Sequence, residues 1–252
     1  MEEENRKGPG IFYAVVGVAT LVVAIIGATF AYFSASASTN EGAITGQTAN
    51  VTGNALTVTA TKFDFAPSGV SNPNLVPAVI DKTSMTSVQN ALTSKCVSDG
   101  YTGCHVWEIT ATSAEAVTMA DIILTLGVTV PEGGVKSNWS YVLFTATKGT
   151  NALTGAAAAT NLYTESSGTW TAASNNGVLT NDLEVHLNGQ AGGAGLAANT
   201  PKTIYLMVYL ANVEGSQNNN VNDQVHTAET GTYSGTVTLD AGGSGRIIAT
   251  FS

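Results

Sequence analysis

The stretch Thr203–Ala211 reads TIYLMVYLA and is apolar at almost every position. A strand that is apolar on both faces is typical of the centre of a sheet that is covered on both sides. We therefore expect Thr203–Ala211 to be a central strand of the fold.

Seven other stretches have strand-like patterns, and most of them alternate apolar and polar residues, which is the period of a half-buried strand. They are Leu56–Phe65, His105–Thr112, Ile122–Val130, Trp139–Ala146, Leu183–Leu187, Thr232–Leu239 and Arg246–Phe251. Loops rich in Gly, Asn and Ala separate them, at Lys148–Thr160, Ser166–Asn181, Asn188–Thr200 and Val213–Gly231. Eight or nine short strands with this punctuation predict a mainly β fold, an antiparallel, jelly-roll-like sandwich or barrel.

Two local features refine this fold. In the first strand the apolar parity changes near Lys62, because Phe63 and Phe65 follow the opposite phase to the residues before them, which predicts a bulge or a change of sheet. One short helix is expected at Asp81–Leu92, with Ser84 able to cap its start. Met85, Val88 and Leu92 fall on one face of that helix.

The composition limits the partners of the chain. Only 11% of the 252 residues are charged, and 9 Lys and Arg stand against 18 Asp and Glu, for a net charge of −9. Nucleic-acid binding needs clustered basic residues, so we expect no nucleic-acid partner.

The N-terminus carries an uncharged apolar run, Ile11–Phe33, preceded by Arg6 and Lys7. As a helix, its 23 residues span about 35 Å, enough to cross a bilayer. The positive-inside rule then exports everything that follows. Residues 1–33 are either a retained single-pass anchor or a long signal peptide that is cleaved.

The exported part divides into two segments. Residues 34–54 are rich in Ser, Ala, Thr, Asn and Gly, and read either as a flexible linker or as an extended arm that can act as a donor strand. The arm reading rests on Phe33, Ala35 and Ala37, which alternate with serines at strand period. Residues 55–252 form the predicted extracellular β-domain.

The chemistry of the chain is sparse. Cys96 and Cys104 enclose the turn-forming pair Asp99-Gly100, and we expect a disulfide, which suits an oxidising compartment. The histidines are isolated in sequence, and the H-E-x-x-H, G-x-S-x-G and P-loop patterns are missing. We therefore expect no catalytic residues, no cofactor and no metal site, and we interpret the Asn-rich loop 217–223 as solvated rather than calcium-binding.

The end of the apolar run, Gly27–Ser34 (GATFAYFS), resembles the export signal of the TasA/camelysin family of biofilm-fibre proteins. The resemblance covers some 15 residues strongly, and this chain differs by Ala28 between the Gly and the Thr. It implies cleavage between Ala31 and Tyr32 by a dedicated signal peptidase. The metalloprotease label of the camelysin branch is not carried over, because no zinc motif is present.

The resemblance implies that the chain is an exported structural subunit of an extracellular fibre or biofilm matrix. Copies of the chain would assemble by strand addition, with Tyr32–Thr52 as the donor arm and Phe33, Ile44 and Val51 as its contact residues. The alternative is a cell-surface binding or adhesion module that residues 11–33 anchor in the membrane.

Overall fold

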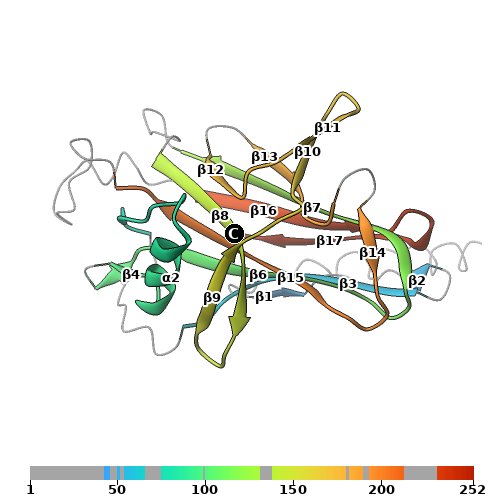
Figure 1. Ribbon diagram of the computed structural model, residues 1–252, viewed down its shortest axis with the longest axis horizontal. Coiled ribbons are helices and arrows are strands. Elements are labelled where there is room, and N and C mark those ends of the chain that lie inside the picture. The colour runs from blue at the N-terminus through green and yellow to red at the C-terminus, as the bar shows by residue number, and fades with distance from the viewer. Residues whose placement is uncertain are drawn as a thin grey trace, which may run out of the picture. The chain divides into compact units, whose positions relative to one another are not determined.

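A computed structural model describes residues 43–45, 50–51, 54–65, 75–98, 100–130, 138–179, 182–189, 193–212 and 232–252 of the chain. These residues belong to one compact unit, Gly42–Ser252. The unit is mainly β and contains one α-helix among its described elements (Figure 1). Two antiparallel sheets pack face to face, which confirms the predicted sandwich, and the described strands do not close into a barrel.

The first sheet follows the order β1-β3-β6-β15-β8-β12, with β2 also paired to β3 and β9 to β8. Its described strands are β1 (Ala43–Thr45), β2 (Asn50–Val51), β3 (Asn54–Lys62), β6 (His105–Ser113), β8 (Trp139–Lys148), β9 (Leu153–Ala158), β12 (Asn176–Val178) and β15 (Lys202–Leu210). The predicted central strand is β15, which pairs with β6 on one side and β8 on the other.

The second sheet follows the order β11-β10-β13-β7-β16-β17, with β14 also paired to β7. Its described strands are β7 (Val117–Thr129), β10 (Tyr163–Ser166), β11 (Thr169–Ala172), β13 (Leu183–His186), β14 (Ala194–Leu196), β16 (Thr232–Asp240) and β17 (Arg246–Phe251). The turn between the last two strands is the 3-10 turn η2 (Gly242–Ser244).

A first core fills the space between the sheets. The inward residues alternate along each strand, as the sequence pattern predicts, so Leu56, Val58 and Ala60 of β3 face Val237 and Leu239 of β16 across one cluster. All five are fully buried. Burying one such aliphatic side chain contributes about 1.5–3 kcal/mol, so this cluster provides much of the stabilisation of the sandwich.

A second core covers the opposite face of the first sheet. The other face of β15 packs there with α2 (Met85–Thr93). The buried side chains of this core include Phe63, Phe65, Val88, Leu92, Val106, Val142, Phe144, Tyr205, Met207 and Tyr209. The change of phase predicted at Lys62 is confirmed. The apolar side chains before Lys62 lie in the first core, whereas Phe63 and Phe65, which follow it, lie in the second core.

The helix that closes the second core has the predicted capping signal. Ser84 is the N-cap, and its hydroxyl accepts a hydrogen bond from the Ser87 N–H at 3.3 Å. Val88 and Leu92 are buried. The helix begins four residues later than predicted, because Asp81 lies outside the helix and accepts hydrogen bonds from Thr83 instead.

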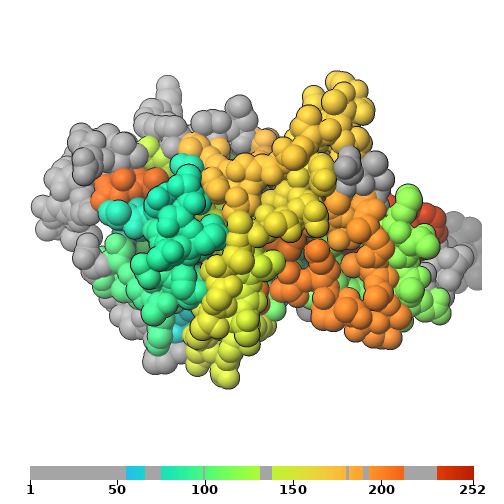
Figure 2. Space-filling view, in the orientation of Figure 1, coloured from blue at the N-terminus to red at the C-terminus, as the bar shows by residue number. Residues whose placement is uncertain are grey.

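One side chain of α2 also covers the outer edge of β9. The Gln89 amide donates to the Leu153 carbonyl at 3.1 Å and accepts from the Ala156 N–H at 2.9 Å. The amide therefore replaces the backbone of a further strand at this edge. Figure 2 shows α2, in blue-green, and β9, in yellow-green, side by side on one face of the molecule.

Four strands lie in stretches that the sequence predicted as loops. They are β9, β11, β12 and β14, and the interpretation of Lys148–Thr160, Ser166–Asn181 and Asn188–Thr200 as loops throughout was wrong in this respect. β9 has the sequence LTGAAA and β12 the sequence NGV, both weak strand formers. Both strands pair with the long strand β8. This pairing stabilises them although their own residues favour strands only weakly. The fourth predicted loop, Val213–Gly231, lies outside the described residues.

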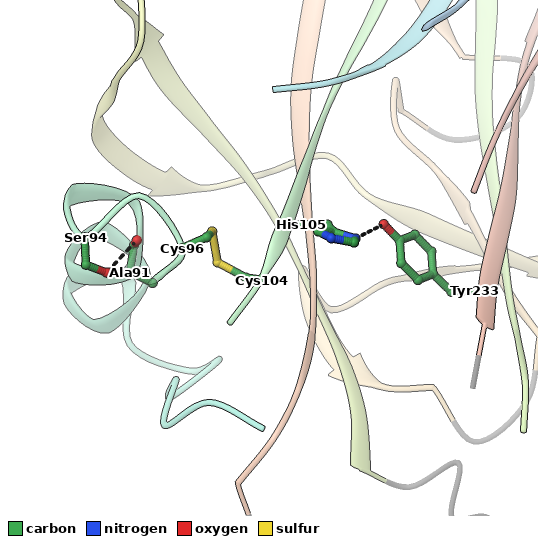
Figure 3. Close-up of a disulfide and its surroundings, with 6 residues drawn as sticks. All are labelled: Ala91, Ser94, Cys96, Cys104, His105 and Tyr233. Carbon is green, nitrogen blue, oxygen red and sulfur yellow. Dashed lines mark hydrogen bonds between the residues drawn. A yellow bond between two sulfur atoms is a disulfide. The ribbon is translucent and has the colours of Figure 1, made fainter. Parts of the chain in front are cut away.

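The predicted disulfide joins Cys96 and Cys104 (Figure 3). Between them, β4 (Val97–Ser98) and β5 (Tyr101–Thr102) pair as a small hairpin. Gly100 has φ +82 in its turn, a conformation that glycine adopts without steric cost. Both sulfurs are buried in the second core beside α2, so the bond fixes the end of the helix to the start of β6.

We expect that replacing both cysteines, Cys96→Ser with Cys104→Ser, lowers the free energy of unfolding by about 2.5 kcal/mol, because the unfolded chain regains the entropy of the closed loop. Urea denaturation followed by circular dichroism would measure this. Reduced wild-type protein is the matched control and should unfold at the lower urea concentration too. Equal midpoints for the oxidised and reduced wild type would contradict the stabilising role of the bond.

Candidate functional site

A hydrogen-bonded aromatic cluster joins the two sheets inside the first core. The Tyr233 hydroxyl of β16 accepts from the Trp107 indole N–H of β6 at 2.8 Å and lies 2.7 Å from Nδ1 of His105. Figure 3 shows the rings of His105 and Tyr233 facing each other across the space between their strands. Trp139 packs against Tyr233 and Phe251 packs against Trp107, while His105 is half-buried.

The geometry assigns the protons in this cluster. An indole nitrogen only donates, so the Tyr233 oxygen accepts from Trp107, and the remaining acceptor for the tyrosine proton is Nδ1 of His105. His105 then carries its own proton on Nε2. Burial raises the pKa of the Tyr233 hydroxyl, which keeps it neutral, although the Trp107 bond acts in the opposite direction. The cluster is therefore suited to fixing the two sheets in register.

A second polar cluster lies on the outer face of the second sheet. Nδ1 of His186, on β13, lies 2.7 Å from Oδ2 of Asp121, on β7, and the two side chains are only 6% and 11% exposed. Among the described residues, Nε2 of His186 has no hydrogen-bond partner, and neither has Oδ1 of Asp121. Oε1 of Glu184 lies 3.7 Å from Nε2. Trp170 of β11 packs edge-on against the imidazole.

Burial decides the electrostatics of this pair. It raises the pKa of Asp121 above the ordinary carboxyl value, while the hydrogen bond and the charge of His186 lower it. A His–Asp pair orients the base in nucleophilic enzymes, where the second ring nitrogen contacts a hydroxyl or thiol. Among the described residues, the buried Nε2 of His186 makes no such contact.

Sequence reasoning treated His186 and Asp121 separately. Both side chains lie on the outer face of the second sheet. The sequence shows this, because in each strand the residue alternates with the apolar residues that face the core. Their contact depends on the register in which β13 and β7 pair, with His186 opposite Ile123 rather than opposite Asp121. Nothing within either strand fixes that register, so the sequence alone did not bring them together.

Two general findings concern only the described part of the chain. No group of three or more His, Cys, Asp or Glu residues there has the arrangement of a metal site. No described helix is long and apolar enough to span a membrane. The apolar run 11–33 and the Asn-rich loop 217–223 lie outside the described residues.

The residues predicted for export and assembly are only partly described. Ala31, Tyr32 and Phe33 lie outside the described residues. Ile44 lies in β1, where its Cα partner on β3 is Ala60, and Val51 lies in β2, where its Cα partner is Asn54. Two parts of the predicted arm therefore pair with β3.

These two strands run along the same edge of β3. β1 is antiparallel to Thr59–Thr61 and β2 is antiparallel to Asn54–Ala55, while the opposite edge of β3 pairs with β6. The register shifts by one residue between β1 and β2. Within the described residues, the contact between this arm and β3 consists of two short ladders of three and two residues.

Comparisons with protein-family models, with curated proteins and with solved structures find no significant match. The resemblance to the TasA/camelysin family remains a prediction from Gly27–Ser34.

We expect Tyr233→Phe to lower the free energy of unfolding by about 1–3 kcal/mol, because the buried indole N–H of Trp107 loses its acceptor. Urea denaturation followed by tryptophan fluorescence would report both the stability and the environment of the indoles. Tyr101→Phe, which removes the hydroxyl of a half-buried tyrosine in β5, is the control. An unchanged midpoint for Tyr233→Phe would show that the hydroxyl does not stabilise the contact between the sheets.

We expect Asp121→Asn to change how stability depends on pH. A raised pKa means that the folded state holds the proton more tightly, so this group stabilises the fold below the ordinary carboxyl pKa of about 4 and loses that contribution as the pH rises through the raised value. The free energy of unfolding of wild type minus that of the variant should therefore fall over this interval. Urea denaturation at a series of pH values measures it.

Asp182 is exposed, so Asp182→Asn is the matched control for removing one carboxylate from the chain. The opposite result would be a wild type whose free energy of unfolding increases relative to that of Asp121→Asn as the pH rises. It would mean that the His186 hydrogen bond affects the pKa of Asp121 more than burial does.

Proposed function

We propose that this chain is an exported structural subunit of an extracellular fibre or biofilm matrix, and that its arm, Tyr32–Thr52, adds as a strand to a neighbouring copy. The observation that supports this most directly is the pairing of β1 and β2 with the outer edge of β3. A segment that can pair with β3 of its own domain can pair in the same register with β3 of the next copy.

The energetics favour such an exchange. The hydrogen bonds of β1 and β2 are the same in either arrangement, so exchange costs little beyond the freedom of the connecting residues, as in domain swapping. The two ladders are short, and isolated strand pairs of this length are weak. The acceptor strand β3, by contrast, is stably packed, because it pairs along its length with β6 and buries Leu56, Val58 and Ala60.

Main-chain pairing would supply affinity in this mode, and alternate side chains would supply register. On β3 the residues facing away from the first core are Thr57, Thr59 and Thr61, which are half-buried. Their neighbours across the ladder on β6 are Thr112, Thr110 and Glu108. The acceptor edge is therefore bordered by a row of threonines, which suits a Thr- and Asn-rich arm.

Export is part of the proposal. The apolar run Ile11–Phe33 directs the chain across the cytoplasmic membrane, and signal peptidase cleavage between Ala31 and Tyr32 frees the arm. The Cys96–Cys104 disulfide supports an oxidising destination. The partners are then other copies of the chain. If the run is retained instead, the same domain is a cell-surface module on an anchor, which is the alternative function.

A reversible lock on the arm tests the proposal. Thr45 and Thr59 are Cα partners on β1 and β3, and paired residues in antiparallel strands lie about 4.5–5.5 Å apart, within disulfide range. We expect the chain with Thr45→Cys and Thr59→Cys, recovered from expressing cells and oxidised as a monomer, to form no fibres in electron micrographs. Reduction should restore assembly, because it frees the arm.

The same variant also reports exchange in the opposite order. If it assembles while reduced and is oxidised afterwards, the new disulfides should link different copies and give a ladder of covalent oligomers on non-reducing gels. Thr45→Cys alone is the control and should assemble under both conditions. Fibres from the oxidised monomer would refute exchange of the arm. Wild-type chains that never assemble, with an N-terminus intact by mass spectrometry, would favour the anchored module.

A further inference from the structure

β17 is the last strand of the second sheet (Figure 1). It reads RIIATF and pairs with β16 along its whole length. No strand of the described residues pairs with its other side. Its inward side chains Ile247, Ala249 and Phe251 are buried, so the strand is firmly packed although one edge is unpaired.

The hydrogen bonds of the hairpin identify the groups on that edge. The Ala241 N–H donates to the Gly245 carbonyl at 2.9 Å, which makes this a hydrogen-bonded pair. Because such pairs alternate along an antiparallel ladder, Ile247 and Ala249 bond to β16, and Arg246, Ile248 and Thr250 direct their N–H and C=O groups away from it.

The neighbouring strands give the same result independently. The Leu187 N–H donates to the Ile122 carbonyl at 2.7 Å, so Ile122 bonds towards β13 and Ile123 bonds towards β16. Thr238 of β16 is the Cα partner of Ile123, so its backbone N–H and C=O bond to β7. Ile248 is the Cα partner of Thr238 on β17, so the N–H and C=O of Ile248 point to the free edge.

The side chains on this edge are exposed as well. Arg246, Ile248 and Thr250 all point to the outer face, and Ile248, at the centre, is 46% exposed. An exposed aliphatic residue in the middle of an unpaired edge is a site at which another strand adds.

The other edge strands among the described residues are short or covered. Gln89 covers the edge of β9, and β1 and β2 cover the edge of β3. β11 and β12 are only four and three residues long. β17 is six residues long and contains no proline, no lysine and no glycine. Its only charged residue, Arg246, lies at one end, so the centre of the strand lacks the usual features that prevent edge pairing.

We propose that β17 pairs antiparallel with β17 of a second copy, across a two-fold axis at Ile248. In this register Ile248 faces Ile248 of the second copy, and Arg246 faces Thr250 at either end. The backbone N–H and C=O groups of the three outward residues of each strand then form about six hydrogen bonds with the other copy. A register shifted by two residues loses about two of these hydrogen bonds. The edge is thus complementary to itself, as a two-fold interface requires.

The side chains fit the same arrangement. The two Ile248 side chains form an apolar pair at the axis, and such cross-strand pairs stabilise a ladder. Arg246 is the only charged residue of β17, and it lies opposite a threonine, so no like charges face each other. This matters in a chain whose net charge is −9. β1 of the arm lies close to β17 but does not pair with it. The proposed contact uses residues of β17 alone, and in a fibre it would join neighbouring filaments side by side.

Single cysteines test the register, since both native cysteines are already bonded. Residues in a hydrogen-bonded antiparallel pair have Cα atoms about 5.5 Å apart, within disulfide range. We expect the full chain carrying Ile248→Cys to form a disulfide-linked dimer on mild oxidation, seen on non-reducing gels. Thr250→Cys should stay monomeric, because two copies of residue 250 would lie roughly 14 Å apart.

A mixture of chains carrying Arg246→Cys and Thr250→Cys should give a mixed dimer, which distinguishes this register from a chance collision. Ile248→Lys should weaken dimerisation about tenfold or more in sedimentation experiments, as a charge on a strand edge does. Absence of the Ile248→Cys dimer, or equal dimer from Thr250→Cys, would overturn the proposal. Locking the arm with Thr45→Cys and Thr59→Cys should leave the β17 contact intact, so the two proposals fail separately.

Discussion

The whole architecture depends on β15 being apolar on both faces. A strand of this kind must be covered twice, and the chain meets that requirement with two separate cores. The second sheet covers one face, and α2 with the disulfide-linked segment covers the other. Because Met207 and Leu206 alternate between these cores along one strand, the helix is as necessary to the sheet as its partner sheet is.

Features encoded within a few residues were predictable from the sequence. The double-faced β15, the helix capped by Ser84, the change of phase at Lys62 and the Cys96–Cys104 bond all have local causes. The missing parts depend on distant pairing. β9 and β12 are poor strands that form because β8 lies beside them, and the contacts of Tyr233 with His105 and of Asp121 with His186 span 128 and 65 residues. Register over such distances is a property of the assembled sheets.

The edges of the two sheets differ in a way that relates to assembly. The edge of β3 carries a short segment of the predicted arm, whereas the edge of β17 has exposed side chains and no partner among the described strands. An edge that is filled by an exchangeable strand suits a head-to-tail contact, which can propagate without limit. A self-complementary edge closes after two copies. A subunit with both kinds of edge can form a filament along one direction and join filaments along another.

The contact between Gln89 and β9 has a consequence for where the molecule completes its fold. The helix that carries Gln89 is tied to the sheet by the Cys96–Cys104 bond, and that bond persists only where thiols are oxidised. In a reducing compartment only packing and the Gln89 hydrogen bonds hold the helix, and the edge of β9 is correspondingly easier to expose. If the chain is exported as proposed, oxidation would therefore act as a maturation step that protects the edge of β9.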